Sequence, residues 1–179
     1  MIEPVHLQIR FADIDSMGHV NNAVYLSYFE YTRVYYFKAM LPPNWDWVSN
    51  GIILAHTEVS YLKPLLLNDD ATVQMLIGEI GTKSFTLHYI IRVNDKIITK
   101  GASTLVCYDS KMQQSIGIPT GDLPSGSVNI AMPAMFQQIK GTYQEQLANG
   151  KVEVFIPPLA VPPVIAGATA PAKASGKSY

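Results

Sequence analysis

The chain has 179 residues, of which 48% are apolar and 15% are charged, and its formal net charge is −1. This length suits one domain with one sizeable core, and the lack of a basic run argues against nucleic acid as a partner. The single cysteine, Cys107, excludes an internal disulfide framework, and no window approaches the ~20 apolar residues of a membrane span. We therefore expect a cytoplasmic protein that does not enter a membrane.

The first predicted element is a half-buried strand over residues 5–11. Its apolar residues, Val5, Leu7, Ile9 and Phe11, alternate with polar ones, which is the period of a strand with one face in a core. A polar loop over residues 12–20 follows and carries two carboxylates.

A long helix is predicted next, beginning near Asn21 or Asn22, because asparagine is a favourable N-cap residue. It should end at about Met40, since Pro42 and Pro43 cannot continue it. This segment is apolar or aromatic around most of its circumference, which is typical of a buried helix. We therefore expect a curved sheet to wrap around it.

Four strands are predicted after the helix, over residues 51–62, 71–80, 84–93 and 96–108. The connections at 81–83 and 94–95 are short enough for hairpins, so the last three strands should form an antiparallel meander. In the middle strand, one face should carry Phe85, Leu87, Tyr89, Ile91 and Val93. The predicted fold class is α+β.

The remaining third of the chain has a different composition. Residues 109–130 are rich in Gly, Pro and Ser and predict an irregular connection. A second helix is predicted over 133–148, a short strand over 154–156, and a Pro/Ala-rich flexible tail over 157–179. The stripe that predicts the second helix consists of Met132, Met135, Phe136, Ile139, Tyr143 and Leu147. These elements predict a domain over 1–110, an extension over 111–156 and the tail.

The chemistry of the chain is concentrated where the polar loop meets the long helix. Asp13 and Asp15 precede a helix N-terminus, whose unpaired N–H groups and positive dipole end favour negative charge. An anionic base or nucleophile would thus lie beside a site for a developing oxyanion. Spacing alone leaves a second interpretation open, in which both carboxylates only stabilise the turn.

The run Arg10 to Asn22, R-F-A-D-I-D-S-M-G-H-V-N-N, together with Tyr25 and Glu30, resembles the hotdog-fold thioesterases. The similarity covers roughly residues 5–110 and favours the branch typified by 4-hydroxybenzoyl-CoA thioesterase. It implies a hotdog fold, in which a curved antiparallel sheet wraps around a central helix, and it implies hydrolysis of acyl-CoA without a cofactor or a metal ion.

The resemblance also implies roles for individual residues. Asp15 would act on the thioester and the backbone N–H of Asn22 would polarise its carbonyl, whereas Asp13 would hold the loop. The expected substrate-binding residues are His19, Asn21, Tyr25, Lys83 and Ser84. The family implies a homodimer or homotetramer with coenzyme A bound across two subunits.

Three other functions stay open at this point. The substrate could be carried by an acyl carrier protein, or the chain could bind acyl-CoA without turning it over. A hotdog enoyl hydratase or dehydratase is the third alternative, although the D-x-N-P-x-H pattern of those enzymes is missing its Asn-Pro here.

Overall fold

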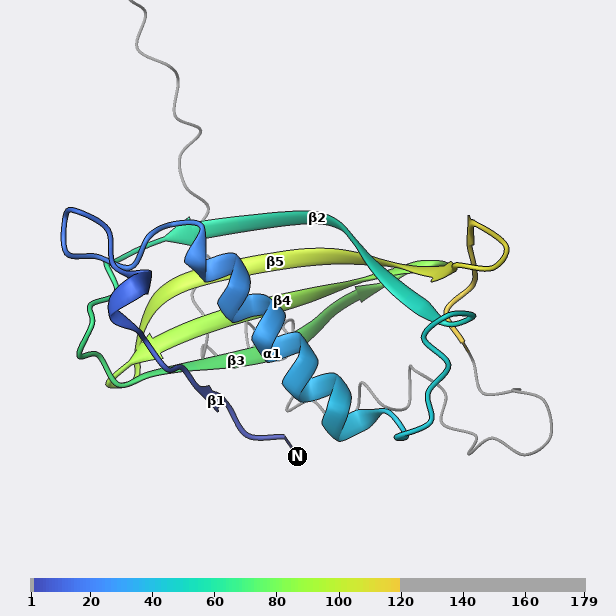
Figure 1. Ribbon diagram of the computed structural model, residues 1–179, viewed down its shortest axis with the longest axis horizontal. Helices are drawn as coiled ribbons and strands as arrows, with labels where there is room; N and C mark the ends of the chain where they lie inside the picture. The colour runs from blue at the N-terminus through green and yellow to red at the C-terminus, as the bar shows by residue number, and fades with distance from the viewer. Residues whose placement is uncertain (1, 120–179) are drawn as a thin grey trace, which may run out of the picture.

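The computed structural model describes residues 2–119 and places one long helix against one face of an antiparallel sheet (Figure 1). The helix α1 spans Val24–Met40, and a short 3-10 turn, η1, spans Phe11–Asp13. The strands are β1 (Val5–His6), β2 (Gly51–Tyr61), β3 (Ala71–Ile80), β4 (Ser84–Val93), β5 (Lys96–Asp109) and β6 (Gln114–Ser115). The sheet order is β1-β3-β4-β5-β2, with β6 paired to β5. This arrangement confirms the predicted α+β class.

The predicted meander is confirmed as β3, β4 and β5, each antiparallel to the next. The turn between β4 and β5 consists of Asn94 and Asp95, both with positive φ, as the tight hairpin turns that match strand twist require. Strand β2 returns antiparallel to β5 and forms one edge of the sheet.

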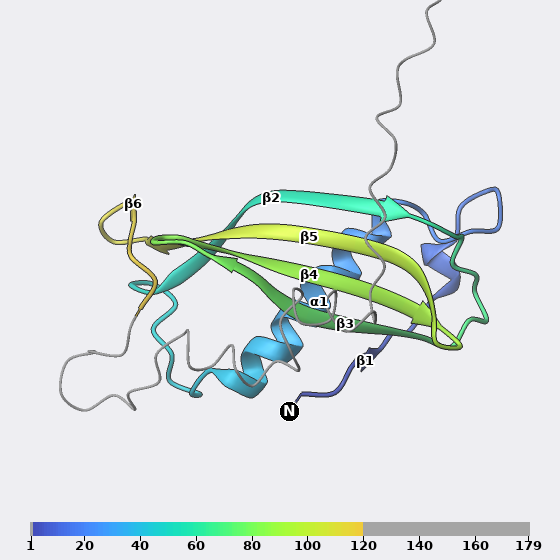
Figure 2. The same ribbon diagram turned by 180° about the vertical axis from the view of Figure 1, so that it is seen from behind.

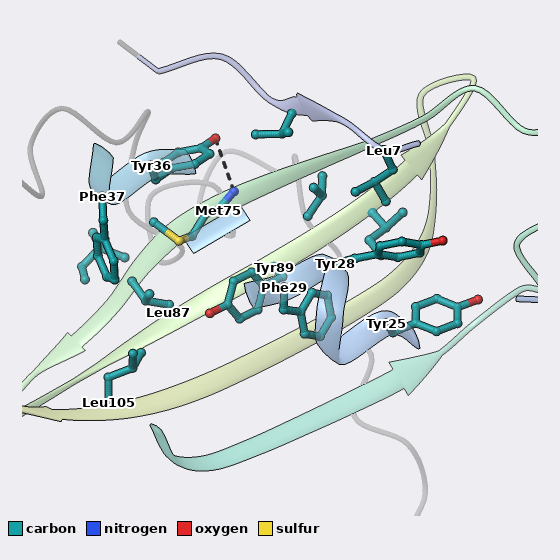
Figure 3. Close-up of a cluster of buried hydrophobic side chains, with 14 of the residues drawn as sticks. Leu7, Tyr25, Tyr28, Phe29, Tyr36, Phe37, Met75, Leu87, Tyr89 and Leu105 are labelled. Carbon is teal, nitrogen blue, oxygen red and sulfur yellow. Dashed lines mark hydrogen bonds between the residues drawn. The ribbon is translucent and has the colours of Figure 1, made fainter. Parts of the chain in front are cut away.

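The core lies between α1 and the inner face of the sheet (Figure 3). Phe29 of α1 stacks on Tyr89 of β4, with ring centroids 4.3 Å apart and planes 10° from parallel. Gly101 of β5 faces the same ring, and a β carbon there would collide with Phe29. Tyr36 also joins the layers, because its hydroxyl accepts a hydrogen bond of 3.4 Å from the backbone N–H of Met75.

The predicted strand over residues 5–11 is wrong beyond its first half. Only Val5 and His6 form ladder pairs with β3, and the N–H of Leu7 adds a further bond to the carbonyl of Ala71. The chain then tightens into η1, and Phe11 is 83% exposed instead of facing the core.

The helix begins two to three residues later than predicted, with Ala23 as its N-cap residue. Asn21 uses its side-chain oxygen to accept a hydrogen bond of 2.9 Å from the N–H of Ala23, and so forms a turn in front of the helix. The predicted end at Met40 is confirmed, and Leu41 already has extended backbone angles before Pro42.

The sheet covers only one side of α1, whereas the apolar circumference predicted a helix enclosed all round. The covered side includes Tyr25, Phe29 and Tyr36. The opposite side leaves large apolar residues 44–53% exposed, namely Leu26, Tyr31, Val34 and Tyr35. Among residues 2–119, no helix or strand covers this side of α1.

Three predictions fall outside the described residues, namely the helix over 133–148, the strand over 154–156 and the tail over 157–179. The domain boundary at 110 also stays a prediction. In the described part, β6 and the buried Ile118 add structure beyond that position, within the segment predicted to be irregular.

Candidate active site

The loop between η1 and α1 forms a small closed hairpin that presents Asp15. Ile14 and Val20 form an isolated antiparallel bridge, and the N–H of Asp15 donates to the carbonyl of His19 at 2.8 Å. Gly18 has φ of +80°, a conformation that side-chain-bearing residues rarely adopt. The glycine therefore allows the chain to reverse and places Asp15 at the start of the hairpin.

The carboxylate of Asp15 is held at one oxygen only. Its Oδ1 accepts hydrogen bonds from the N–H groups of Met17 at 2.8 Å and His19 at 3.2 Å. Among residues 2–119, Oδ2 has no hydrogen-bond partner, and the residue is half-buried. One oxygen thus fixes the orientation of the carboxylate and the other stays available to a water molecule or a substrate.

The turn that precedes α1 contains one backbone N–H group without an acceptor among the described residues. The N–H of Asn21 donates to the carbonyl of Asp13. The N–H of Ala23 donates to the side-chain oxygen of Asn21, and the N–H of Val24 donates to the backbone carbonyl of Asn21. The carbonyl of Asn22 accepts a hydrogen bond of 3.0 Å from the hydroxyl of Tyr61. Within the described part of the chain, the N–H of Asn22 is the donor of this turn that has no acceptor.

Asp15 and Asn22 line the same open groove, which has a volume of about 300 Å³. Tyr25, at the start of α1, and Tyr61, at the end of β2, lie in it edge to face, with ring centroids 4.9 Å apart. Burial raises the pKa of both phenols, so both remain protonated hydrogen-bond donors at neutral pH. The other lining residues are His19, Val20, Leu62, Lys63 and Pro64.

Asp13 supports the site from behind. It is buried, and its Oδ2 accepts hydrogen bonds from the N–H of Arg10 at 2.8 Å and from the hydroxyl of Tyr28 at 3.0 Å. Burial alone would raise the pKa of this carboxyl, but the hydrogen bonds and the Arg10 guanidinium hold it below its usual value. Asp13 therefore ties the loop to α1, as the sequence predicted.

The structure brings together four of the predicted site residues, Asp15, His19, Asn22 and Tyr25, in one groove. Asn21 lies next to them but uses its side chain to hold the turn.

Lys83 and Ser84 lie elsewhere, at the other end of the sheet. Ser84 pairs with Val106, whereas the groove residue Tyr61 pairs with Thr99 of the same strand. This spacing amounts to roughly 23 Å along a strand. The amine of Lys83 donates to the carbonyl of Ser115 at 2.9 Å. The assignment of Lys83 and Ser84 to substrate binding therefore stays a prediction.

Tyr61 is one of the groove residues that the sequence did not assign to the site. It ends a long strand just before Lys63-Pro64, a pattern that places an aromatic ring at a strand end. Its partner Asn22 is 39 residues away, so only the folded arrangement reveals the contact.

Two further properties bear on what the described residues can bind. They contain no group of three or more His, Cys, Asp or Glu side chains placed to hold a metal ion. No helix among them is both long enough and apolar enough to cross a membrane.

Comparison with known proteins places this geometry in a family. A sequence profile of the thioesterase-like superfamily matches residues 9–139. The chain belongs to that superfamily, and the curved antiparallel sheet with its long helix is the hotdog fold of its relatives.

Three relatives illustrate the relationship. The long-chain acyl-CoA thioesterase FadM of Escherichia coli is 24% identical over 115 residues, which cover 63% of this chain and 87% of that protein. An uncharacterized Bacillus subtilis protein, YsmA, is 29% identical over 86 residues. The match covers 47% of this chain and 56% of YsmA, so the chain spans just over half the length of that relative. A Thermus thermophilus thioesterase, solved with coenzyme A and zinc, is 34% identical with a TM-score of 0.56, covering 65% of this chain and 85% of that one.

Proposed function

We propose that this protein hydrolyses acyl-CoA thioesters. The observation that carries the proposal is the pairing, in one groove, of a carboxylate oxygen of Asp15 and the N–H of Asn22, neither with a partner among the described residues. A thioester carbonyl needs both groups at once, a base or nucleophile on one side and a hydrogen-bond donor for its oxygen on the other. Membership of the thioesterase-like superfamily supports the same chemistry.

In the proposed reaction, the carbonyl oxygen of the thioester accepts a hydrogen bond from the N–H of Asn22. Asp15 takes a proton from a water molecule, whose oxygen forms a bond to the carbonyl carbon. The C–S bond then breaks, and the thiolate of coenzyme A takes up the proton. A covalent route is equally open, in which Asp15 attacks the carbon, the C–S bond breaks to release the thiolate of coenzyme A, and water hydrolyses the resulting anhydride to the free acid and the Asp15 carboxylate.

The direct test is a panel of short, long and aromatic acyl-CoAs, with release of free thiol as the measurement. Cys107 does not contribute to the signal, because burial raises its pKa to about 11. Turnover of at least one acyl-CoA supports the proposal. Tight binding of acyl-CoAs without turnover would instead make the chain a binding module. Turnover only of acyl carrier protein substrates would show that the acyl group is carried by acyl carrier protein and not by coenzyme A.

We further propose that two copies form the working enzyme. Among the described strands, β2 pairs only with β5, so its other edge is free to pair with a second β2. Ile53 and Leu54 on this strand are 46% and 52% exposed, and the uncovered side of α1 is apolar as well. A groove of about 520 Å³ at the C-terminal end of α1, lined mainly by Phe37, Pro42 and Trp47, extends that apolar surface.

Light scattering during size exclusion tests this assembly against the 19.7 kDa mass of one chain. The native protein should have twice that mass, and Ile53→Lys should yield a monomer with little activity. Ile80→Lys is the matched control, because Ile80 is 47% exposed at the end of β3, away from the proposed interface. A monomeric native protein with full activity would contradict the proposal.

A second copy also offers a place for Lys83. Since Lys83 is far from the groove of its own chain, it would reach a bound coenzyme A only across the interface. Lys83→Ala should then raise KM for an acyl-CoA and leave KM unchanged for the N-acetylcysteamine thioester of the same acid, which has no phosphates. An equal change in both values would remove Lys83 from coenzyme A binding.

A further inference from the structure

The helix α1 covers the inner face of β4 but leaves the inner face of β2 partly uncovered. Tyr89, on β4 beneath the helix, is 0% exposed. Leu54 of β2 points to the same face, since it pairs with the core residue Leu105, and yet it is 52% exposed. Figures 1 and 2 show the reason, because α1 begins beside the end of β2 and then runs away from it towards β3. We call the inner-face side chains of β2, namely Leu54, Thr57, Val59 and Tyr61, the β2 strip.

The β2 strip starts at the candidate active site. Tyr61, at its end, lines the groove together with Asp15 and Asn22. Val59, the next inner-face residue, is half-buried and packs against the core. Leu26, in the first turn of α1, is 46% exposed. An acyl group whose carbonyl lies between Asp15 and Asn22 can therefore extend from the groove over apolar side chains.

A row of polar side chains crosses this path further along. Nη1 of Arg33, on α1, donates a hydrogen bond of 3.1 Å to the hydroxyl of Tyr89. Burial raises the pKa of Tyr89, while the Arg33 guanidinium and the Ser103 hydroxyl beside it oppose the shift. Ser103 in turn shares a hydrogen bond of 3.0 Å with Thr57 of the β2 strip. This polar row runs from α1 to β2 and ends the apolar stretch.

Arg33 is the charged member of the polar row and has no counter-ion. It is half-buried, and within residues 2–119 no acidic side chain forms an ion pair with it, including Glu30 on the same helix. A guanidinium has five N–H donors in a planar fork, and among the described residues Tyr89 accepts from one of them. The remaining donors match the two oxygens of a carboxylate. Because a half-buried charge without a partner is unfavourable, an anionic group on a ligand would be stabilised here.

The distance from the groove to the polar row sets the length of the acyl group. Tyr61 pairs with Thr99, whereas Thr57 pairs with Ser103. The two pairs are four residues apart on β5, which is roughly 13 Å along a strand. An extended chain advances about 1.2 Å per bond, since the three backbone bonds of a residue span about 3.6 Å. The distance therefore corresponds to roughly eleven bonds, or an acyl chain of about twelve carbons.

We propose that the substrate is the mono-coenzyme A thioester of an α,ω-dicarboxylic acid, and that Arg33 binds its free carboxylate. This inference rests on the proposed function, since it takes Asp15 and Asn22 as the place of the thioester. The methylene chain lies over the β2 strip in this arrangement, and the distal carboxylate accepts hydrogen bonds from the guanidinium. Arg33 thus determines which acyl groups are hydrolysed and takes no part in the bond-breaking step.

Two thioesters of equal length test the inference, namely dodecanedioyl-CoA, which ends in a carboxylate, and dodecanoyl-CoA, which ends in a methyl group. The native protein should hydrolyse the first with a kcat/KM at least ~10-fold higher, the effect of charge-assisted hydrogen bonds. Arg33→Met should abolish this preference by lowering kcat/KM for dodecanedioyl-CoA, without lowering it for dodecanoyl-CoA. Lys38→Met is the matched control, because Lys38 is an exposed cation on the same helix, and it should keep the preference.

A second variant separates recognition of the carboxylate from a structural role. Arg33→Lys keeps the positive charge without the planar fork, so it should keep part of the preference for dodecanedioyl-CoA. If Arg33 only supported the fold or the assembly, its variants would lose turnover of both thioesters equally, or become monomeric, and that result would overturn the inference.

The remaining outcomes distinguish this inference from the proposed function. Equal kcat/KM for the two thioesters in the native protein, or a preference that survives Arg33→Met or is lost in Lys38→Met, would overturn the role of Arg33 and leave acyl-CoA hydrolysis intact. No turnover of either thioester or of the acyl-CoA panel would instead overturn the proposed function, and this inference with it.

Discussion

The hydroxyl of Tyr61 donates a hydrogen bond of 3.0 Å to the carbonyl of Asn22, and this contact ties the end of β2 to the turn in front of α1. It occupies the acceptor of Asn22 and leaves the donor of the same residue without a partner in the described part of the chain. The ring of Tyr61 also packs against Tyr25, so both the ring and the hydroxyl of Tyr61 are held in place. Tyr61 therefore positions the N–H group that the proposed reaction uses.

Tyr61→Phe should lower kcat by about 5–10-fold, the effect of one hydrogen bond worth roughly 1 kcal/mol, and change KM by less than about twofold. The ring packing survives this substitution, so the melting temperature should barely move. Tyr108→Phe is the control and should leave kcat unchanged, because the Tyr108 hydroxyl donates to Gln113 at the surface, at the end of β2 opposite Tyr61. A Tyr61→Phe enzyme with native kcat would show that the contact does not position the site.

Asp13→Asn should destabilise the fold by about 1–3 kcal/mol, because the amide loses the buried negative charge and its NH2 group replaces the Oδ1 that lies 3.4 Å from the Arg10 guanidinium. Chemical denaturation measures the loss. Asp69→Asn is a suitable comparison, since Asp69 accepts a backbone hydrogen bond at an exposed position. An Asp13 variant as stable as the Asp69 variant would mean that the loop does not depend on Asp13.

The stability of the protein should fall as the pH is lowered from 7 towards 5, in part because of His88. Burial lowers the pKa of His88 below its ordinary value of 6.5, although the nearby Glu58 and Glu79 oppose this shift. The unfolded chain then binds a proton before the folded one does, so this part of the stability is complete above the unfolded pKa and is lost as the pH falls below it.

His88→Gln removes the imidazole that binds this proton. The melting temperature of the variant should therefore depend less steeply on pH over the same range. His6→Gln serves as the control, because His6 is exposed and bonds Asp70 at the surface. Equal pH dependence in the native protein and the His88 variant would contradict the assignment.

Features set by neighbouring residues were predictable from the sequence. The meander follows from alternation and from the Asn94-Asp95 turn, and the end of α1 follows from Pro42 and Pro43. The same local reasoning placed Asp15 in front of the helix.

Features set by distant contacts were not predictable. The strand ladder of β1 stops at His6, because the chain leaves β3 and residues 11–13 fold into η1. Alternation in the sequence continues past that point and gives no sign of the change. The contact of Tyr61 with Asn22 likewise depends on how β2 returns beside the helix. The exposed side of α1 shows that apolar residues indicate burial without indicating which surface provides it.

The most direct measurement of the central claim is the turnover of the Asp15→Asn variant on the best acyl-CoA substrate. This amide keeps an oxygen for the N–H groups of Met17 and His19, so the hairpin should stay folded and its melting temperature close to native. The amide is neither a base nor a nucleophile, and kcat should fall by at least about 100-fold with KM little changed. A folded Asp15→Asn protein with near-native kcat would contradict the account.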